Sequence, residues 1–129
     1  MKRIIKLFLF TIIQLQFLFA TPLEEEFAKH FHEGKYNGRT IGRCVLALGK
    51  PTYSYEYVVN EEYMFLTEKE PDYWKYFSEQ ELKSGVKIRY YIWKKGKGDN
   101  TNWTEAWAKK EKNKWVVFDS MWYDSTIEF

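Results

Sequence analysis

The sequence has little cysteine, proline or histidine: one Cys, three Pro and two His in 129 residues. Because Cys44 has no second cysteine to pair with, an internal disulfide is impossible and the disulfide-stapled folds are excluded. His30 and His32 are two positions apart in a predicted helix, where their side chains point about 200° apart. They cannot share a metal ion, so the sequence predicts no metal site and no cofactor.

A long apolar run occurs only at the N-terminus. Three basic residues precede an apolar run over Leu7–Phe19, and Ala20 supplies a small residue for cleavage. This order is typical of a secretory signal peptide over residues 1–20 and predicts an exported protein, periplasmic or secreted. A transmembrane helix needs about 20 apolar residues, and the run is shorter; an uncleaved membrane anchor is the alternative. A single domain remains over residues 21–129.

An excess of positive charge is also missing once this leader is set aside. The whole chain carries 20 basic and 18 acidic residues, and Lys2, Arg3 and Lys6 lie in the leader. The remaining 17 basic and 18 acidic residues give a net charge of −1. The charge of the exported part therefore gives no support for nucleic-acid binding.

The sequence does contain a short helix with both ends marked. Four apolar residues recur at the helical spacing i, i+3, i+4 and i+7 and predict one buried stripe: Ile41, Cys44, Val45 and Leu48. Thr40 is a good N-cap and Gly49 a good C-cap. Cys44 is predicted to be a buried small hydrophobic residue, with a disulfide-linked dimer as the alternative, and the oligomeric state stays open.

The rest of the chain predicts a second helix and a series of strands. The helix covers residues 22–33. Alternation and turn signals predict strands over residues 52–59, 63–66, 86–93, 103–109 and 115–119, with 121–129 either continuing the last strand past a bulge or forming another. Residues 67–85 are less regular, with a helical turn after Pro71 and a capping box from Ser78 to Glu81. Short turns between the later strands predict an antiparallel meander.

The faces of these strands suggest how the helices pack. Thr104, Ala106 and Ala108 form a face of small residues, which lets helices approach closely. The predicted fold class is therefore α+β, with two short N-terminal helices packed on one face of an antiparallel β-meander. The opposite face is then expected to hold four aromatic side chains with no helix to cover them: Tyr91, Trp93, Trp103 and Trp107.

The capped helix carries a pattern that extends beyond its ends: Gly-x-Thr, an apolar residue, then Leu-Gly-x-Pro. Its members are Gly38, Thr40, Cys44, Leu48, Gly49 and Pro51. In this pattern and in the order of elements, the chain resembles small exported bacterial proteins of the SmpA/OmlA and beta-lactamase-inhibitor-protein-like group. The resemblance implies two short helices on an antiparallel sheet, protein binding through the sheet, and no catalysis. The chain departs from the group in lacking a lipid-attachment Cys and in a long stretch between Leu66 and Val86.

These features predict a non-enzymatic binding module. Trp and Tyr supply contact area, and neighbouring lysines attract an acidic partner. The predicted binding residues are Tyr91, Trp93, Lys94, Trp103, Trp107 and Lys109. The expected partner is a protein or a cell-envelope component. The alternative is a cystatin-like cone of the nuclear-transport-factor type, with a small-ligand pocket or an enzymatic role.

Overall fold

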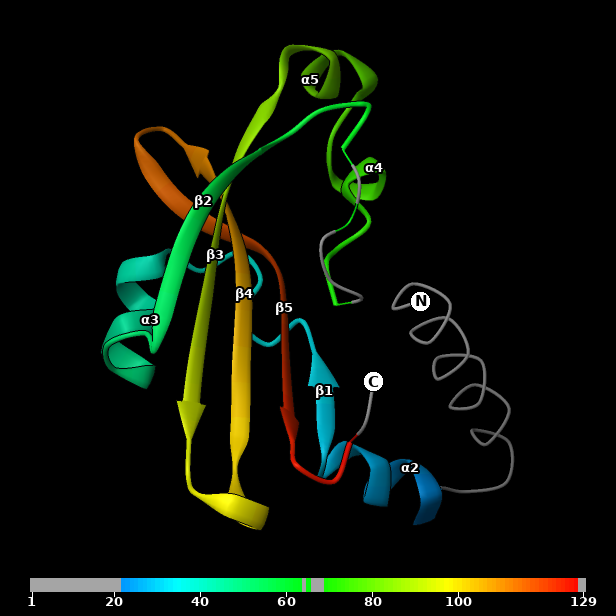
Figure 1. The fold of residues 1–129 in the computed structure, drawn as a ribbon, viewed down its shortest axis with the longest axis vertical. Helices are drawn as coiled ribbons and strands as arrows, with labels where there is room; N and C mark the ends of the chain where they lie inside the picture. The colour runs from blue at the N-terminus through cyan, green and yellow to red at the C-terminus, as the bar shows by residue number, and fades with distance from the viewer. Residues whose placement is uncertain (1–21, 64, 66–68, 128–129) are drawn as a thin grey trace.

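The computed structural model describes residues 22–63, 65 and 69–127, so the predicted leader over residues 1–20 lies outside the described residues. The described chain has an α+β fold with one five-stranded antiparallel sheet in the order β1-β5-β4-β3-β2 (Figure 1). The strands are β1 (Phe31–Glu33), β2 (Tyr53–Val59), β3 (Val86–Lys95), β4 (Asn102–Glu111) and β5 (Lys114–Asp124). The helices are α2 (Pro22–Ala28), α3 (Ile41–Leu48), α4 (Tyr73–Tyr76), α5 (Glu79–Ser84) and the 3-10 turn η1 (Gly98–Asn100).

The strands from β2 to β5 pair with their neighbours in sequence, which confirms the predicted antiparallel meander. β5 runs unbroken past a register shift, where Ala108 faces Val117 while Trp107 faces Asp119. Phe118 is the extra residue of a bulge between these two pairs. The first of the two alternatives that the sequence left open for residues 121–129 is therefore confirmed as far as Asp124.

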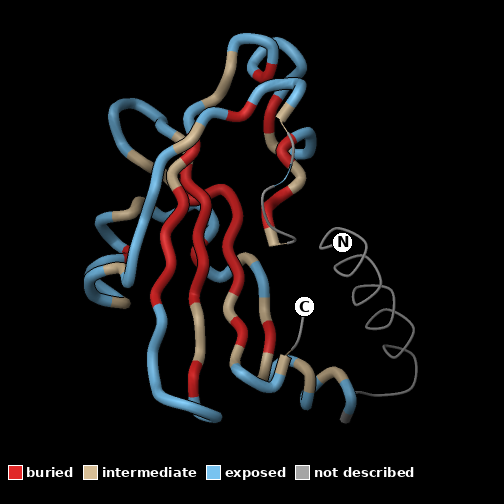
Figure 2. The backbone as a smooth tube through the Cα atoms, viewed as in Figure 1, coloured by how far each residue is buried: buried red, intermediate tan, exposed pale blue. Residues whose placement is uncertain are grey.

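The sheet separates two buried clusters, one on each face. Along β3, Tyr90 and Ile92 belong to one cluster, and Tyr91 and Trp93 belong to the other. This division follows the predicted alternation of the strand. Buried residues fill the middle of β3, β4 and β5, whereas most of β2 is exposed (Figure 2).

α3 packs on the face of small residues. Its N-cap, Thr40, accepts a hydrogen bond from a first-turn amide at 3.3 Å, and Gly49 follows its last turn with a φ of 85°, as predicted. Cys44 is fully buried in one cluster with Ala106 and Ala108. The small side chains allow the helix to lie close to the sheet. We call this the α3 side of the sheet.

The buried stripe of α3 is narrower than the sequence predicted. Val45 is exposed, and Ile41 and Leu48 are only partly buried, so Cys44 alone is fully covered. An eight-residue helix has about two turns, and only the innermost side chain lies directly over the sheet. The indole nitrogen of Trp93 donates a hydrogen bond to the Gly49 carbonyl at 2.8 Å and ties the helix end to β3.

The predicted helix over residues 22–33 is wrong in its second half. α2 ends at Ala28, and residues 31–33 form β1, which pairs with β5. Pairing buries Phe31 in the core and stacks His32 on Trp122 at 4.9 Å, so tertiary contacts override a local helical pattern. Packing of both N-terminal helices on one face is not confirmed, because Phe27 of α2 packs against the cluster opposite α3. No helix in the described ranges is long and apolar enough to cross a membrane.

The described residues within 60–85, here called the inserted segment, cover the face opposite α3. Tyr73, Phe77 and Leu82 pack into the cluster on that face. The predicted helical turn and capping box are confirmed as α4 and α5. The predicted strand over residues 63–66 is not seen at Tyr63 and Phe65, and its other two positions lie outside the described residues.

Candidate binding site

The structure divides the aromatic residues that were predicted to form one binding face. Tyr91 and Trp93 lie opposite the small residues of β4 and share their face, so both are buried on the α3 side. Trp103 and Trp107 point to the other side of the sheet. The predicted grouping of all four is wrong, because the register of β3 and β4 sets large rings beside small side chains rather than beside tryptophans.

The predicted residues on the side opposite α3 are not left uncovered. Trp107 is only 1% exposed and belongs to the same cluster as Tyr73 and Phe77 of the inserted segment, and Trp103 is partly buried. Lys109 is partly buried, and its ammonium lies 5.6 Å from the Phe77 ring, whereas Lys94 is exposed near the end of β3. The expectation that no helix covers this face is wrong, because residues of α4 and α5 pack on it.

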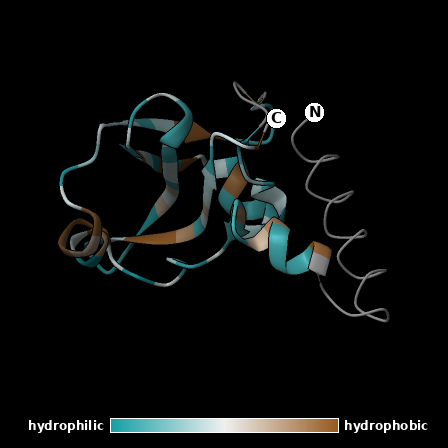
Figure 3. Cartoon of the chain, turned by 90° about the horizontal axis from the view of Figure 1, so that it is seen from below, coloured by the Kyte–Doolittle hydropathy of each residue, from teal (hydrophilic) through white to brown (hydrophobic). Residues whose placement is uncertain are grey.

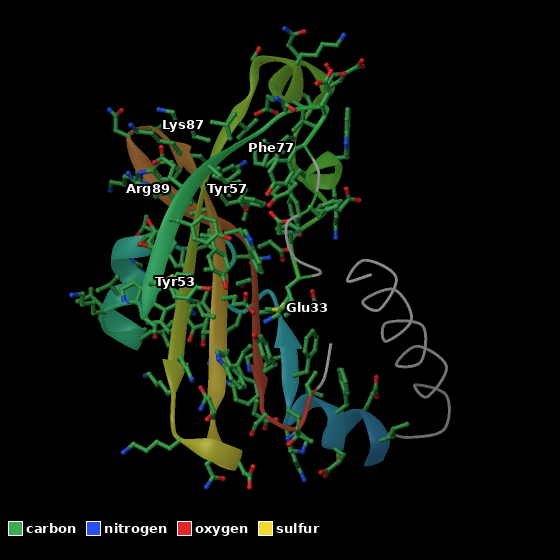
Figure 4. All side chains as sticks on the ribbon, viewed as in Figure 1. Glu33, Tyr53, Tyr57, Phe77, Lys87 and Arg89 are labelled. Carbon is green, nitrogen blue, oxygen red and sulfur yellow. The ribbon has the colours of Figure 1, made fainter. Side chains whose placement is uncertain are left out.

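A different group of aromatic residues gathers on this side. Seven tyrosines come from three strands and the inserted segment, and we call them the tyrosine cluster: Tyr53, Tyr55, Tyr57, Tyr63, Tyr73, Tyr90 and Tyr123. The first six are linked by ring contacts with centroid distances from 5.1 to 6.5 Å. Tyr57 lies at the end of β2 that is nearer to Phe77 of the inserted segment, and Tyr53 lies at the other end (Figure 4).

One end of the tyrosine cluster is organised by a buried carboxylate, Glu70. The hydroxyls of Tyr63 and Tyr73 donate hydrogen bonds to its Oε1 at 2.6 and 2.9 Å. The Tyr57 hydroxyl in turn lies 2.5 Å from that of Tyr73. Glu70 is 4% exposed, and these donors help to compensate for its lost hydration. The network joins the inserted segment to β2.

A second buried carboxylate, Glu105 of β4, organises the middle of the cluster. Tyr90 donates a hydrogen bond to its Oε1, and the Lys69 ammonium lies 3.3 Å from its Oε2. Lys69 also donates to the Tyr123 hydroxyl and lies 4.6 Å from the centroid of the Tyr123 ring. Lys69 of the inserted segment thus places positive charge beside the Glu105 carboxylate in the middle of the sheet, where an uncompensated charge would be unfavourable.

Burial keeps most of these hydroxyls protonated. It raises the pKa of five cluster members above the ordinary value of 10.0: Tyr57, Tyr63, Tyr73, Tyr90 and Tyr123. The nearby carboxylates act in the same direction, since a second negative charge beside them is unfavourable. At neutral pH these side chains are hydrogen-bond donors with an apolar ring, a combination suited to binding rather than to accepting a proton.

The cluster is open at its β2 end. Tyr53 is 55% exposed and Tyr55 is 39% exposed, and their rings stack with an interplanar angle of 12°. Both rings rest against the buried Tyr90. Tyr53 and Tyr55 therefore form an aromatic surface that is accessible to solvent and is held in place by Tyr90.

The histidines and the cysteine show no sign of a metal centre. In the described ranges, no group of three or more His, Cys, Asp or Glu side chains could hold a metal ion. His30 is hydrogen-bonded to Asp124 at 2.7 Å. Burial raises the pKa of the Cys44 thiol and disfavours the reactive thiolate.

Comparison with known proteins identifies no relative: no protein-family model, curated protein or solved structure matches this chain. The resemblance to the SmpA/OmlA and beta-lactamase-inhibitor-protein-like group thus stays a prediction.

The sequence contained part of the signal for the observed site. Tyr53, Tyr55 and Tyr57 alternate along one predicted strand, which places them on one face. The contributions of Glu70 and Lys69 were missed, because they depend on the path of the inserted segment. Glu105 shares a face of β4 with Trp103 and Trp107, and the sequence pattern alone does not show that the inserted segment contacts it through Lys69.

Proposed function

We propose that this chain is an exported, non-enzymatic binding module that holds an extended segment of a partner protein at β2. The partner segment pairs with the outer edge of β2 and contacts the open end of the tyrosine cluster. The observation that carries this proposal is the exposure of β2 as an edge strand bearing the stacked Tyr53 and Tyr55.

The edge of β2 has few features that discourage pairing. In the described part of the chain, β2 pairs with β3 alone, along its full length and without a register shift. Its seven residues contain no proline and no lysine, and its one charged residue, Glu56, forms an ion pair with Arg89 at 3.0 Å. Exposed edges of natural sheets are usually protected by prolines, lysines or bulges, and unprotected edges accept extended peptides.

The two exposed tyrosines add side-chain contacts to this backbone edge. Tyrosine supplies a large, amphipathic contact area and has only two side-chain torsions to fix on binding. Ring contacts with Tyr90 already restrict Tyr53 and Tyr55, so less entropy is lost when a partner binds.

The export and the class of partner are further parts of the proposal. The leader-like composition of residues 1–20 supports export, and the helix pattern shared with the beta-lactamase-inhibitor-protein-like group supports protein binding. The alternative of a cystatin-like cone with a ligand pocket also stays a prediction, and we find no particular contact that favours it.

Capture from envelope extract tests the proposal. Wild-type protein should recover a partner that the double variant Tyr53→Ser/Tyr55→Ser does not. Trp74→Ser is the matched control, because Trp74 is 53% exposed on α4 and lies outside the tyrosine cluster. Equal recovery by the wild type and the double variant would show that these tyrosines do not bind the partner.

Hydrogen exchange on the purified complex tests the edge pairing separately. Pairing should slow exchange of β2 amides that face solvent in the free protein. A complex that forms without any slowing in β2 would place the partner elsewhere on the tyrosine cluster.

A further inference from the structure

The outer side of α3 is apolar. Leu46 lies about 200° around the helix from the buried Cys44, and it is 88% exposed. Val45 and Ala47, on either side of it, are also exposed. α3 is the brown helix at the left edge of Figure 3, where the strong hydrophobicity of its residues is visible. An exposed apolar helix face of this kind marks a site of contact with another surface.

Basic residues are close to this apolar face in the sequence. Residues 34–55 carry Lys35, Arg39, Arg43 and Lys50 and no acidic residue. Arg43 stands three positions before Leu46, so the two side chains are neighbours on the helix surface. The stretch therefore combines exposed apolar side chains with a local charge of +4, although the exported part of the chain has slightly more acidic than basic residues.

We infer that the outer face of α3 binds the surface of an anionic lipid bilayer. Leu46 and Val45 enter the boundary between headgroups and acyl chains, and the basic side chains contact the negatively charged headgroups. Apolar residues on one helix face with cations around them are the composition of interfacial membrane helices. The positive charge of the stretch complements an anionic surface.

The size of the helix favours a bilayer over a protein as its partner. An eight-residue helix is about 12 Å long and about 10 Å wide, so its outer face is much smaller than the roughly 800 Å² that each partner buries in a stable protein interface. A bilayer needs no complementary shape. Each inserted apolar side chain and each nearby cation adds to the binding.

This inference goes beyond the proposed function and is independent of it. α3 lies on one face of the sheet, and the tyrosine cluster lies on the other. A chain bound through α3 therefore keeps Tyr53 and Tyr55 directed away from the bilayer. Loss of one activity would leave the other intact.

A fluorophore at residue 46 tests this directly in the full chain. The variant Leu46→Cys is labelled with a nitrobenzoxadiazole dye, which brightens when it enters lipid. Cys44 is fully buried with a raised thiol pKa, so the dye reacts at the new, exposed cysteine. The matched control carries the dye at Trp74→Cys, on the opposite side of the sheet.

We expect the dye at position 46 to brighten with vesicles of equal parts phosphatidylcholine and phosphatidylglycerol, and far less with phosphatidylcholine alone. The dye at position 74 should not respond. Adding Arg43→Gln and Lys50→Gln should weaken the affinity for the anionic vesicles on the order of thirtyfold. Each cation near the surface contributes about 1 kcal/mol to binding. Added salt should weaken it too.

Three results would overturn the inference. The first is no response at position 46 with anionic vesicles. The second is an equal response at positions 46 and 74, which would reflect contact through another part of the chain. The third is a response to soluble polyglutamate without any response to vesicles, which would assign the α3 face to an acidic protein.

Discussion

The imidazole Nδ1 of His30 lies 2.7 Å from Oδ2 of Asp124 and joins two residues that are 94 positions apart. The Asp124 amide also donates to the His30 carbonyl at 3.0 Å, so the contact fixes the end of α2 to the end of β5. The hydrogen bond to Asp124 raises the pKa of His30. Burial opposes ionisation of Asp124, but its hydrogen bonds with His30 and Thr126 outweigh this effect and lower its pKa.

This pair predicts a pH-dependent stability. The contribution of protonated His30 is complete below its ordinary pKa of 6.5 and is lost as the pH rises through the raised pKa of the folded state. The contribution of ionised Asp124 is lost as the pH falls below 3.8. The difference in unfolding free energy between wild type and His30→Gln should therefore be largest between pH 3.8 and 6.5.

Urea unfolding across this range measures that difference. His32→Gln is the control, because burial lowers the pKa of His32 and its protonation opposes folding. Its difference from wild type should change with pH in the opposite direction. A His30→Gln difference that is the same on both sides of pH 6.5 would contradict the assigned role of this contact.

The Tyr90→Phe variant tests the buried network around Glu105. Removal of the hydroxyl leaves a carboxylate that is 3% exposed without one of its donors. A hydrogen bond to a charged group contributes about 1.5–3 kcal/mol, and we expect a loss of unfolding free energy in that range. Tyr53→Phe is the matched control and should stay within about 0.5 kcal/mol of wild type. Equal effects of the two variants would show that Glu105 does not depend on Tyr90.

The raised tyrosine pKa values predict alkaline destabilisation. In the unfolded chain the phenols ionise near pH 10.0, whereas the buried members of the tyrosine cluster stay neutral to higher pH. Stability is therefore complete below pH 10.0 and falls as the pH rises above it. Absorbance of phenolate during an alkaline titration should show a group of tyrosines that ionise only as the protein unfolds. A single smooth titration of all tyrosines, with no loss of structure, would contradict this account.

The C-cap of α3 gives a prediction about backbone strain. Gly49 has φ 85° and ψ −165°, a conformation that other residues avoid, and an added Cβ would meet no atom within 4 Å. Gly49→Ala should therefore cost about 1–3 kcal/mol of unfolding free energy through backbone strain alone.

Leu48→Ala should cost less than the 2–5 kcal/mol typical of a fully buried leucine. We expect roughly 1–2 kcal/mol, because Leu48 is only partly buried. In thermal melts, Lys95→Ala should stay within about 0.5 kcal/mol of wild type, and a larger effect there would contradict this ranking.

Local signals in the sequence predicted the elements well. The caps Thr40 and Gly49, the capping box at Ser78 and the alternation of β3 each depend on residues within one turn or one strand. Such signals act between residues that are close together in the chain.

The candidate site depended on contacts between distant parts of the chain. The register of β3 and β4 places Tyr91 beside Ala106. The burial of Glu105 depends on the path of the inserted segment. The strand at Phe31 was missed for the same reason, because only its pairing with β5 distinguishes it from the continuing helix. Local periodicity does not encode the path of the inserted segment, and the register of β3 and β4 depends on the turn between the strands as well as on their hydrophobic pattern.

The position of β1 has a consequence for the order of folding. Short connections join β3 to β4 and β4 to β5, and residues 60–85 separate β2 from β3, whereas β1 pairs with β5 across nearly the whole domain. Closing so long a loop delays the contact, so β1 should join a meander that has already formed. Because β1 is only three residues long, it should be the first strand to separate from the sheet. Native-state hydrogen exchange should then show the lowest opening free energy at Phe31–Glu33, well below that of β3 and β4.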